Sequence, residues 1–402
     1  MKCKFFSTVS KVKPLLFHNF RREKTVKRIF LLVLYFSAVL ISGCMPGEKI
    51  NEKEIPPWQA TPLNGLDLAF QKADPQWLGA DSVSSVPLGA SRILWLFGDT
   101  LIQAPTGGGR KKARIIRNSL AIQMLGKQGP ERIRFYWHKD RNRPVAVFLP
   151  KTGPGWLWPL SGFFLKGKLY LFYVRVVRSD TVLGFEIQGS LLITVQNPRD
   201  PPAGWKHVQH EVPFFHHGTH GDLFFGVACM VDKEQIYIYG IREDWNQGME
   251  GRSLLVARAP SDAFPGFSFS DWHFFSSAGW SKDPSKATAL FDGAATEMSV
   301  NYMPFLKKFA AVYTYCGLSG KILMRTAPHP QGPWGKPMVL WTCPEESWSK
   351  QYFCYAGKDH PEIASARNEI VISYACNSSN PENLVTEPRL YWPRFVKVTF
   401  QK

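Results

Sequence analysis

Short apolar runs separated by turn residues recur along the chain, and they predict strands rather than helices. The clearest example lies within residues 79–100, where the strand-like stretch 81–88 is followed by the continuous apolar run 93–97 and then by Gly98-Asp99-Thr100. Short runs rich in β-branched and aromatic residues, bounded by Gly and polar residues, are typical of buried strands. Long amphipathic helical patterns are almost absent. The sequence therefore predicts an all-β fold.

The pairing of two such strands by a short turn recurs at about residues 82, 161, 222, 297 and 361. The expected pairs are 82–88 with 93–97, 161–164 with 169–173, 224–228 with 236–239, 298–302 with 309–313, and 362–364 with 370–374. Three further segments begin at Leu191, Leu254 and Lys321, and each is a strand followed by a Pro-containing turn and a Trp. Their spacing of about 60 to 70 residues is typical of a solenoid or propeller. Five pairs predict a five-bladed β-propeller, with an ordinary β-sandwich as the alternative.

The first 44 residues have the pattern of an export signal. They hold nine Lys or Arg and one acidic residue, which is +8 of the net +17 and leaves +9 on residues 45–402. A basic stretch precedes the apolar run 29–41, which is shorter than the roughly 20 residues of a membrane span. Ser42-Gly43-Cys44 then resembles a bacterial lipobox, with an ordinary cleavage site as the alternative.

This pattern predicts a lipoprotein signal peptide over 1–44, lipidation of Cys44, a tether over 45–61 and a propeller domain over 62–402. The expected location is the cell envelope, with a membrane anchor through Cys44. Because Met45 follows the cysteine, bacterial sorting rules favour the outer membrane, facing the periplasm. The remaining positive charge is spread out and matches no nucleic-acid-binding module, so we expect no nucleic-acid partner.

Five cysteines remain after Cys44, and export permits disulfides. Cys343 and Cys354 are the expected pair, and Cys229 and Cys316 lie in apolar strands where buried thiols are expected. Since no Cys or His cluster has zinc-ligand spacing, the sequence predicts no metal site and no cofactor. The sequence leaves open whether a calcium ion fills the channel.

In a propeller the residues that lead the innermost strand of each blade converge at one mouth of the channel. They are Asp81, Trp158 to Ser161, His220 to Asp222, Glu297, and His360 to Glu362. Converging carboxyl groups beside aromatic rings suit glycoside hydrolysis, in which one carboxyl group donates a proton and another acts as base or nucleophile.

We therefore expect Asp81 to be the base or nucleophile and either Asp99 or Glu297 to be the acid, its pKa raised by burial and by neighbouring carboxylates. The expected substrate contacts are Trp158, Asp222, His360, Arg117 and Asn118. Structural alternatives remain for several of them, because Asp99 and Asp222 also suit turns and His360 precedes a proline.

The segments Gly79-Ala80-Asp81, Trp95 to Thr100 and Asn118-Ser119 resemble the opening of a bacterial family of exported five-bladed propellers. That family was long catalogued as a domain of unknown function and includes endo-D-arabinanases. The segments Glu297 to Tyr302 and His360-Pro361 are similar to its later strands, and the resemblance covers most of 62–400.

This resemblance implies catalytic acids in the first blade, at Asp81 and Asp99. A more distant similarity to five-bladed furanosidases of the arabinanase and invertase type implies Asp81 and Glu297 instead. Both imply cleavage of a furanoside-containing polysaccharide. The insert 110–114 and the His-rich loop 216–220 have no counterpart in the family. The competing interpretations are a non-catalytic surface propeller that binds a glycan or a protein, and a structural protein of the envelope.

Overall fold

The computed structural model describes residues 55–89, 91–126, 132–181, 184–218, 220–266 and 268–401. The expected signal peptide, the lipidation site Cys44 and most of the expected tether lie outside these residues. Within the described ranges, no helix has both the length and the apolar character needed to cross a membrane.

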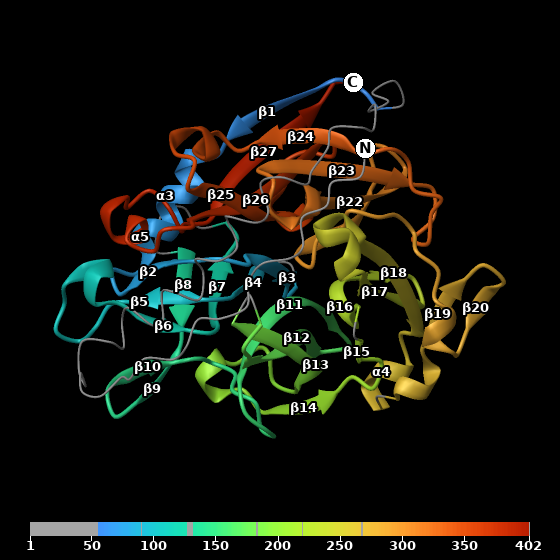
Figure 1. Cartoon of the computed structure of the whole chain (residues 1–402), viewed down its shortest axis with the longest axis horizontal. Coiled ribbons are helices and arrows are strands. Elements are labelled where there is room, and N and C mark those ends of the chain that lie inside the picture. Colours follow the sequence, from blue (N-terminus) through green and yellow to red (C-terminus); the bar gives the residue numbers. More distant parts are fainter. Residues whose placement is uncertain are drawn as a thin grey trace, which may run out of the picture.

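The fold is all-β, as the sequence predicts, and five antiparallel sheets hold most of its strands (Figure 1). The first sheet contains β3 (Ser84–Pro87), β4 (Arg92–Phe97), β7 (Ser119–Met124) and β8 (Ile133–Tyr136). The second contains β11 (Trp156–Leu165), β12 (Lys168–Arg178), β13 (Phe185–Val195) and β14 (His207–Glu211). The third contains β15 (His216–Gly218), β16 (Gly221–Asp232), β17 (Gln235–Glu243), β18 (Arg252–Pro260), β19 (His273–Ser276) and β20 (Gly279–Ser281).

The chain continues into two further large sheets and two small ones. The fourth sheet contains β21 (Met298–Met303), β22 (Lys308–Thr314), β23 (Lys321–Ala327) and β24 (Met338–Thr342). The fifth contains β25 (Tyr352–Asp359), β26 (Glu369–Ser378), β27 (Arg394–Phe400) and β1 (Trp58–Pro62). The small sheets are β2 (Trp77–Ala80) with β5 (Thr100–Ile102) and β6 (Arg114–Ile116), and β9 (His138–Asp140) with β10 (Arg143–Val145).

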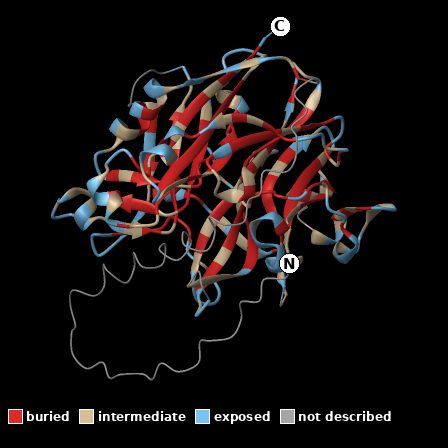
Figure 2. Cartoon of the chain, turned by 45° about the horizontal axis from the view of Figure 1, so that its top comes forward, coloured by how far each residue is buried: buried red, intermediate tan, exposed pale blue. Residues whose placement is uncertain are grey.

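The five large sheets follow one another around the molecule in chain order (Figure 1). One strand of each large sheet, here called its inner strand, lines a common cavity; these inner strands are β3, β11, β16, β21 and β25. The side chains of Ser85 on β3 and His360 after β25 are 2.6 Å apart, so the fifth sheet contacts the first. Buried positions concentrate in the strands, whereas the connecting loops are exposed (Figure 2). Groups that lead these five strands are therefore brought to one end of the cavity.

Four of the five expected strand pairs are confirmed, namely β3 with β4, β11 with β12, β16 with β17, and β21 with β22. The three echoing segments are β13, β18 and β23, each the second strand after the inner strand of its sheet. The fifth pair is wrong, because residues 361–363 form the 3₁₀ helix η11 (Pro361–Ile363) and the inner strand is β25, which precedes it. Pro361 has no N–H group to donate to a strand ladder. His360 therefore follows its inner strand instead of leading it.

The fold begins before residue 62, within the stretch expected to be a tether. Residues 58–62 form β1, which pairs with β27 and completes the outer edge of the fifth sheet. The Trp58 ring lies 6.4 Å from the Phe400 ring, and Ile55 is buried. Pairing an edge strand satisfies its backbone groups. The tether prediction is therefore wrong for this part.

One longer helix, α3 (Asn64–Ala73), was not expected from the sequence. Phe70 of this helix is fully buried against the Trp95 and Phe395 rings, at 5.2 and 5.1 Å. The Asp67 carboxylate accepts a hydrogen bond from the backbone N–H of Phe395 at 2.9 Å. A helix of ten residues that buries so few side chains gives a weak periodic signal, which explains why the sequence did not reveal it.

The disulfide joins Cys354 to Cys376, so the expected pair Cys343–Cys354 is wrong. Cys354 of β25 and Cys376 of β26 are opposite one another in the ladder, which places their side chains on the same face. Cys343 is instead a buried thiol. Cys316 is buried outside the disulfide, as expected, and Cys229 is partly exposed.

Asn118 is placed differently from the expected substrate contact. It is fully buried, and its Nδ2 donates to the backbone carbonyls of Phe148 and Leu157 at 2.8 and 2.9 Å. Its Oδ1 accepts from the backbone N–H of Phe148 at 2.8 Å. The amide group of the Asn118 side chain thus connects the start of β7 to Phe148 and to β11.

We expect Asn118→Ala to lower the free energy of unfolding by about 3 kcal/mol, because it leaves two buried carbonyls and one N–H without partners. Urea unfolding followed by circular dichroism measures the change. Asn368→Ala is the matched control, since it removes a single partly buried bond to the Phe400 carbonyl and should cost about 1 kcal/mol. Equal costs for the two variants would contradict the assigned role of Asn118.

Candidate active site

Two acidic residues meet where the first sheet begins. Asp81 precedes β3, and Asp99 follows β4. The N–H of Asp81 donates to the carbonyl of Asp99 at 3.4 Å, and the N–H of Gly98 donates to the carbonyl of Asp81 at 3.1 Å. These backbone bonds fix the two segments side by side. The structure thus brings together the two residues that the sequence singles out.

The carboxyl group of Asp81 is held by two tyrosines. The phenol O–H groups of Tyr355 and Tyr391 both donate to Oδ2 of Asp81, at 2.8 and 3.0 Å. Burial and, to a smaller extent, the nearby carboxyl groups of Asp99 and Glu297 together raise the pKa of Asp81 to about 8, although the two phenols oppose the shift. At neutral pH the protonated form of Asp81 is therefore favoured.

The carboxyl group of Asp99 has a different environment. Its Oδ2 lies 2.6 Å from Nη1 of Arg117, and its Oδ1 accepts from the indole N–H of Trp158 at 2.7 Å. Burial raises the pKa of Asp99, while the Arg117 charge and the two donors oppose that rise. The Arg117 guanidinium also stacks over the Trp156 ring at 4.6 Å. The ionised form of Asp99 thus has a cation and an N–H donor directed at it.

Glu297 is the third carboxyl group near Asp81, and it pairs with Lys358. The Nζ of Lys358 lies 3.6 Å from Oε1 of Glu297 and also donates to the backbone carbonyl of Ser82. Burial lowers the pKa of Lys358, and the charges of Glu297 and Asp81 oppose this shift. The Glu297 side chain is 25% exposed, so it is accessible to solvent.

These three carboxyl groups do not form a compact metal cage. Among the described residues, the group of three ligand atoms that all lie within 4.8 Å of one another consists of Glu345, Cys354 and Cys376. The two cysteines of that group are joined as a disulfide. The arrangement of Asp81, Asp99 and Glu297 therefore suits acid–base chemistry better than metal binding.

The backbone directly after Asp81 is strained. Ser82 and Val83 have φ values of 71° and 46°, and a β-branched residue with positive φ is an outlier. Each such residue costs about 1–3 kcal/mol and persists only where its surroundings hold it. Here Val83 is fully buried, and the Ser82 carbonyl accepts from Lys358. The strain is located where Asp81 is turned toward Asp99.

Three residues that the sequence did not single out complete the site: Tyr355, Tyr391 and Lys358. All three come from the fifth sheet and the loop before β27, far from Asp81 in the chain. A lysine inside the buried strand β25 was a visible signal, because a buried charge needs a partner. The two tyrosines carried no local signal.

Asp222 lies apart from this centre. It is buried, and its Oδ1 pairs with Nδ1 of His217 at 2.7 Å. Burial raises the pKa of Asp222 to about 6, and the bond to His217 opposes this rise. The exposed side chain of Trp245 lies edge-on to the His217 ring at 6.0 Å. The cluster at the start of β16 is therefore a histidine–carboxylate pair beside an aromatic ring.

His360 directly follows the last residue of β25 instead of leading an inner strand. It is fully buried, and its ring nitrogens bond the hydroxyls of Ser85 and Ser373, both at 2.6 Å. Burial lowers the pKa of His360 to about 3. Both ring nitrogens are engaged, so the expected contact between His360 and a substrate at the Asp81 mouth does not occur.

A cavity of about 290 Å³ opens beside His360 and is lined by residues of all five inner strands. Two acidic side chains that line it, Asp359 and Glu362, each have one buried oxygen without a hydrogen-bond partner. Burial and, to a smaller extent, the charge of Glu362 together raise the pKa of Asp359 to about 7. These two carboxyl groups of the channel would suit a cation, such as the calcium ion whose presence the sequence leaves open.

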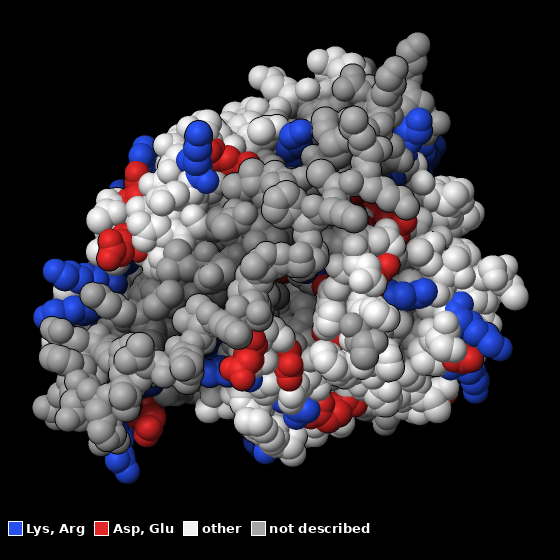
Figure 3. Space-filling model, viewed as in Figure 1, with Lys and Arg blue, Asp and Glu red and all other residues white. Residues whose placement is uncertain are grey.

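The surface on the face shown in Figure 3 carries charges of both signs. On the face shown in Figure 3, Lys and Arg side chains lie among Asp and Glu side chains over the described residues. This distribution agrees with the spread-out charge seen in the sequence.

Gly98 keeps the two acids in contact, because a Cβ atom at this position would lie 2.5 Å from Oδ1 of Asp81. We expect Gly98→Ala to displace the Asp81 carboxyl group while the protein stays folded. A crystal structure of the variant would show the loss of at least one phenol bond to Asp81. Gly204→Ala is the control, since a Cβ there meets no atom within 4 Å. If the Asp81 carboxyl group does not move in Gly98→Ala, Gly98 is not what keeps the two acids in contact.

The chain is similar to solved structures of low sequence identity. One is a protein from Bacteroides ovatus named as a candidate hydrolase, with a TM-score of 0.67, 18% identity, and coverage of 89% of this chain and 93% of that one. Another is an endo-arabinase from Bacteroides thetaiotaomicron, with a TM-score of 0.45, 13% identity, and coverage of 81% and 95%. A third is an exo-1,5-alpha-L-arabinanase from a bovine ruminal metagenomic library, with a TM-score of 0.42, 10% identity, and coverage of 81% and 95%.

No curated protein matches the chain in sequence. Residues 66–400 match a family described as a domain of unknown function, DUF5005. The resemblance to endo-D-arabinanases in particular stays a prediction. Because the match covers most of its 402 residues, the chain belongs to the DUF5005 family.

Proposed function

We propose that the protein is a glycoside hydrolase that cleaves a furanoside-containing polysaccharide. The observation that carries this proposal is the buried pair Asp81 and Asp99, in which two phenols bind Asp81 and a guanidinium and an indole N–H bind Asp99. Glycoside hydrolysis needs one protonated carboxyl group and one carboxylate on either side of the scissile bond. Titratable groups whose environments separate their pKa values are the natural candidates for these two roles.

The environments favour Asp81 as the general acid. The roles of Asp81 and Asp99 are thus the reverse of those expected from the sequence. Oδ2 of Asp81 already accepts two phenol O–H groups, so the proton belongs on Oδ1. From there it passes to the glycosidic oxygen as the bond to the sugar breaks. Tyr355 and Tyr391 orient the carboxyl group without taking the proton.

Asp99 then supplies the carboxylate that stabilises the oxocarbenium-like transition state, as nucleophile or base. Arg117 and Trp158 favour its ionised form against the rise in pKa that burial causes. Glu297 keeps a negative charge near Asp81 and so helps Asp81 to retain its proton. Trp156 and Trp158 offer partly exposed ring surface beside these groups for stacking on a sugar.

The wider setting of this proposal comes from the sequence. We propose that the five large sheets are the blades of a closed five-bladed β-propeller, and that the chain is exported and anchored in the cell envelope through a lipid on Cys44. The furanoside substrate rests on the sequence resemblance. We further propose that catalysis requires no cofactor. Any cation in the channel would be held by Asp359 and Glu362, away from Asp81.

The proposal is tested by incubating the purified protein with arabinans, galactans and fructans and measuring the release of reducing ends. We expect turnover of at least one furanoside-containing glycan and a loss of roughly 10²- to 10⁴-fold in Asp81→Asn, because the variant cannot donate a proton. Asp292→Asn, at an exposed carboxylate bonded by Ser253, is the matched control. A folded protein that binds a glycan without cleaving any would favour the binding-module interpretation.

The pH dependence tests the assignment of the acid. Since the pKa of Asp81 is raised to about 8, activity that needs its proton is present below pH 8 and lost as the pH rises through that value. Glu297→Gln removes a negative charge beside Asp81, so we expect the alkaline limb of kcat/KM to move down by roughly one pH unit. An alkaline limb that stays in place, or moves up, would show that Asp81 is not the titrating acid.

A further inference from the structure

The Cys354–Cys376 disulfide lies next to both tyrosines that hold Asp81. Tyr355 directly follows Cys354 in β25 and donates to Oδ2 of Asp81. The backbone N–H of Tyr391 donates to the carbonyl of Cys376 at 2.8 Å, while its phenol reaches the same Oδ2. Each cysteine of the disulfide is therefore joined by one peptide bond or one backbone hydrogen bond to a tyrosine whose phenol binds Asp81.

The inner strand β25 needs an anchor at this point. It is the end strand of its sheet and pairs with β26 alone. The regular pairing extends from Tyr352 to Tyr355, and then the register shifts before Lys358. Ala356 within this irregular part has a φ of 61°, which is unfavourable for a residue with a Cβ atom. The disulfide thus ties down the regular pairing next to a bend.

Because of this bend, two side chains of β25 reach different carboxyl groups. Tyr355, before the shift, reaches Asp81, and Lys358, after it, reaches Glu297. The Gly357 N–H between them donates to the Thr314 hydroxyl at 2.9 Å. A change in the direction of β25 at Cys354 would therefore disturb both contacts.

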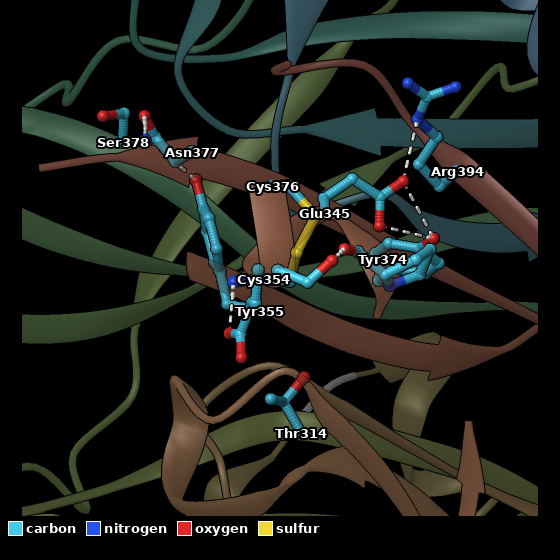
Figure 4. Close-up of a disulfide and its surroundings, with 12 residues drawn as sticks. Thr314, Glu345, Cys354, Tyr355, Tyr374, Cys376, Asn377, Ser378 and Arg394 are labelled. Carbon is cyan, nitrogen blue, oxygen red and sulfur yellow. Dashed lines mark hydrogen bonds and ion pairs between the residues drawn. A yellow bond between two sulfur atoms is a disulfide. The ribbon is translucent and has the colours of Figure 1, made fainter. Parts of the chain in front are cut away.

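Further bonds hold the disulfide and Tyr355 together (Figure 4). The Asn377 side chain, next to Cys376, donates from Nδ2 to the Tyr355 phenol oxygen at 3.3 Å. The Cys354 N–H donates to Oε1 of Glu346 at 3.0 Å. Both cysteines are buried, with exposed fractions of 0% and 2%. The disulfide is thus enclosed, and short covalent and hydrogen-bonded connections link it to the Tyr355 phenol.

We propose that the Cys354–Cys376 disulfide is a positioning element for Asp81, because it fixes the strands from which Tyr355 and Tyr391 reach this carboxyl group. The inference rests on the proposed function for its effect on catalysis, but its structural part stands independently. The charged and titratable groups that face Asp81 are Tyr355, Tyr391, Lys358, Asp99 and Glu297. Of these, the two phenols are the groups that the disulfide holds.

The test compares the purified protein with the double variant Cys354→Ala/Cys376→Ala. The phenol bonds favour the ionised form of Asp81, so weakening them raises the pKa of Asp81. We expect the alkaline limb of kcat/KM to move up by roughly half a pH unit or more, as it should in Tyr355→Phe. We also expect kcat/KM at pH 7 to fall roughly tenfold. Cys343→Ala, at a buried thiol outside the disulfide, should leave the limb in place.

A crystal structure of the double variant gives a readout that needs no activity. We expect the bond between the Tyr355 phenol and Oδ2 of Asp81, 2.8 Å long in the intact protein, to lengthen beyond 3.5 Å. If no glycan is cleaved by the intact protein, loss of this bond still supports the positioning role while the proposed function fails. A lower melting temperature with an unchanged bond and an unchanged pH profile would make the disulfide merely stabilising and overturn the proposal.

If the double variant does not fold, Asn377→Ala tests the same path without touching the disulfide. It removes the donor that connects the strand of Cys376 to the Tyr355 phenol. We expect a smaller upward movement of the alkaline limb and a displaced Tyr355 ring in the crystal. An unmoved ring together with an unmoved limb would overturn the proposal by this route as well.

Discussion

The burial of two carboxyl groups side by side is the constraint on which the rest of the site depends. Backbone bonds between the Asp81 and Asp99 segments fix this arrangement, and two like charges in a region of low dielectric cannot both be ionised without a large cost. The protein meets this constraint by giving Asp99 a cation and an indole donor, and Asp81 two neutral phenols. Arg117 and Trp158 favour the anion at Asp99, whereas burial and the neighbouring carboxyl groups keep the proton on Asp81 although its two phenols oppose this.

The ring-like order of the sheets supplies these partners from distant parts of the chain. The first sheet and its connections supply Asp81, Asp99 and Arg117, the second sheet supplies Trp158, and the fifth supplies Tyr355. Each partner arrives at the leading end of an inner strand or beside it. The local strain at residues 82–83 fits this picture, because a backbone held from several sheets can keep a conformation that an isolated turn would not adopt.

Much of the fold could be predicted from local patterns, whereas the partners within the site could not. Short apolar runs identify strands, so Asp81 and Asp99 stood out as acids at the ends of buried strands. Tyr355 and Tyr391 act through tertiary contacts that no local pattern encodes. The fifth inner strand was misplaced because its pairing is interrupted by a bend, and the disulfide was misassigned because its pairing depends on the same ladder. Asn118 looked like a surface ligand since burial cannot be read from one polar residue before a strand.

The most direct test of the central claim is a titration of the Asp81 carboxyl carbon by ¹³C NMR, with Asp81→Asn used to assign the signal. The account predicts a pKa of about 8 for Asp81 in the intact protein. It also predicts a lower value in Asp99→Asn, where the neighbouring charge is gone. A value for Asp81 close to 3.8, the usual value for an aspartate, would contradict the account, because Asp81 would then hold no proton to donate at neutral pH.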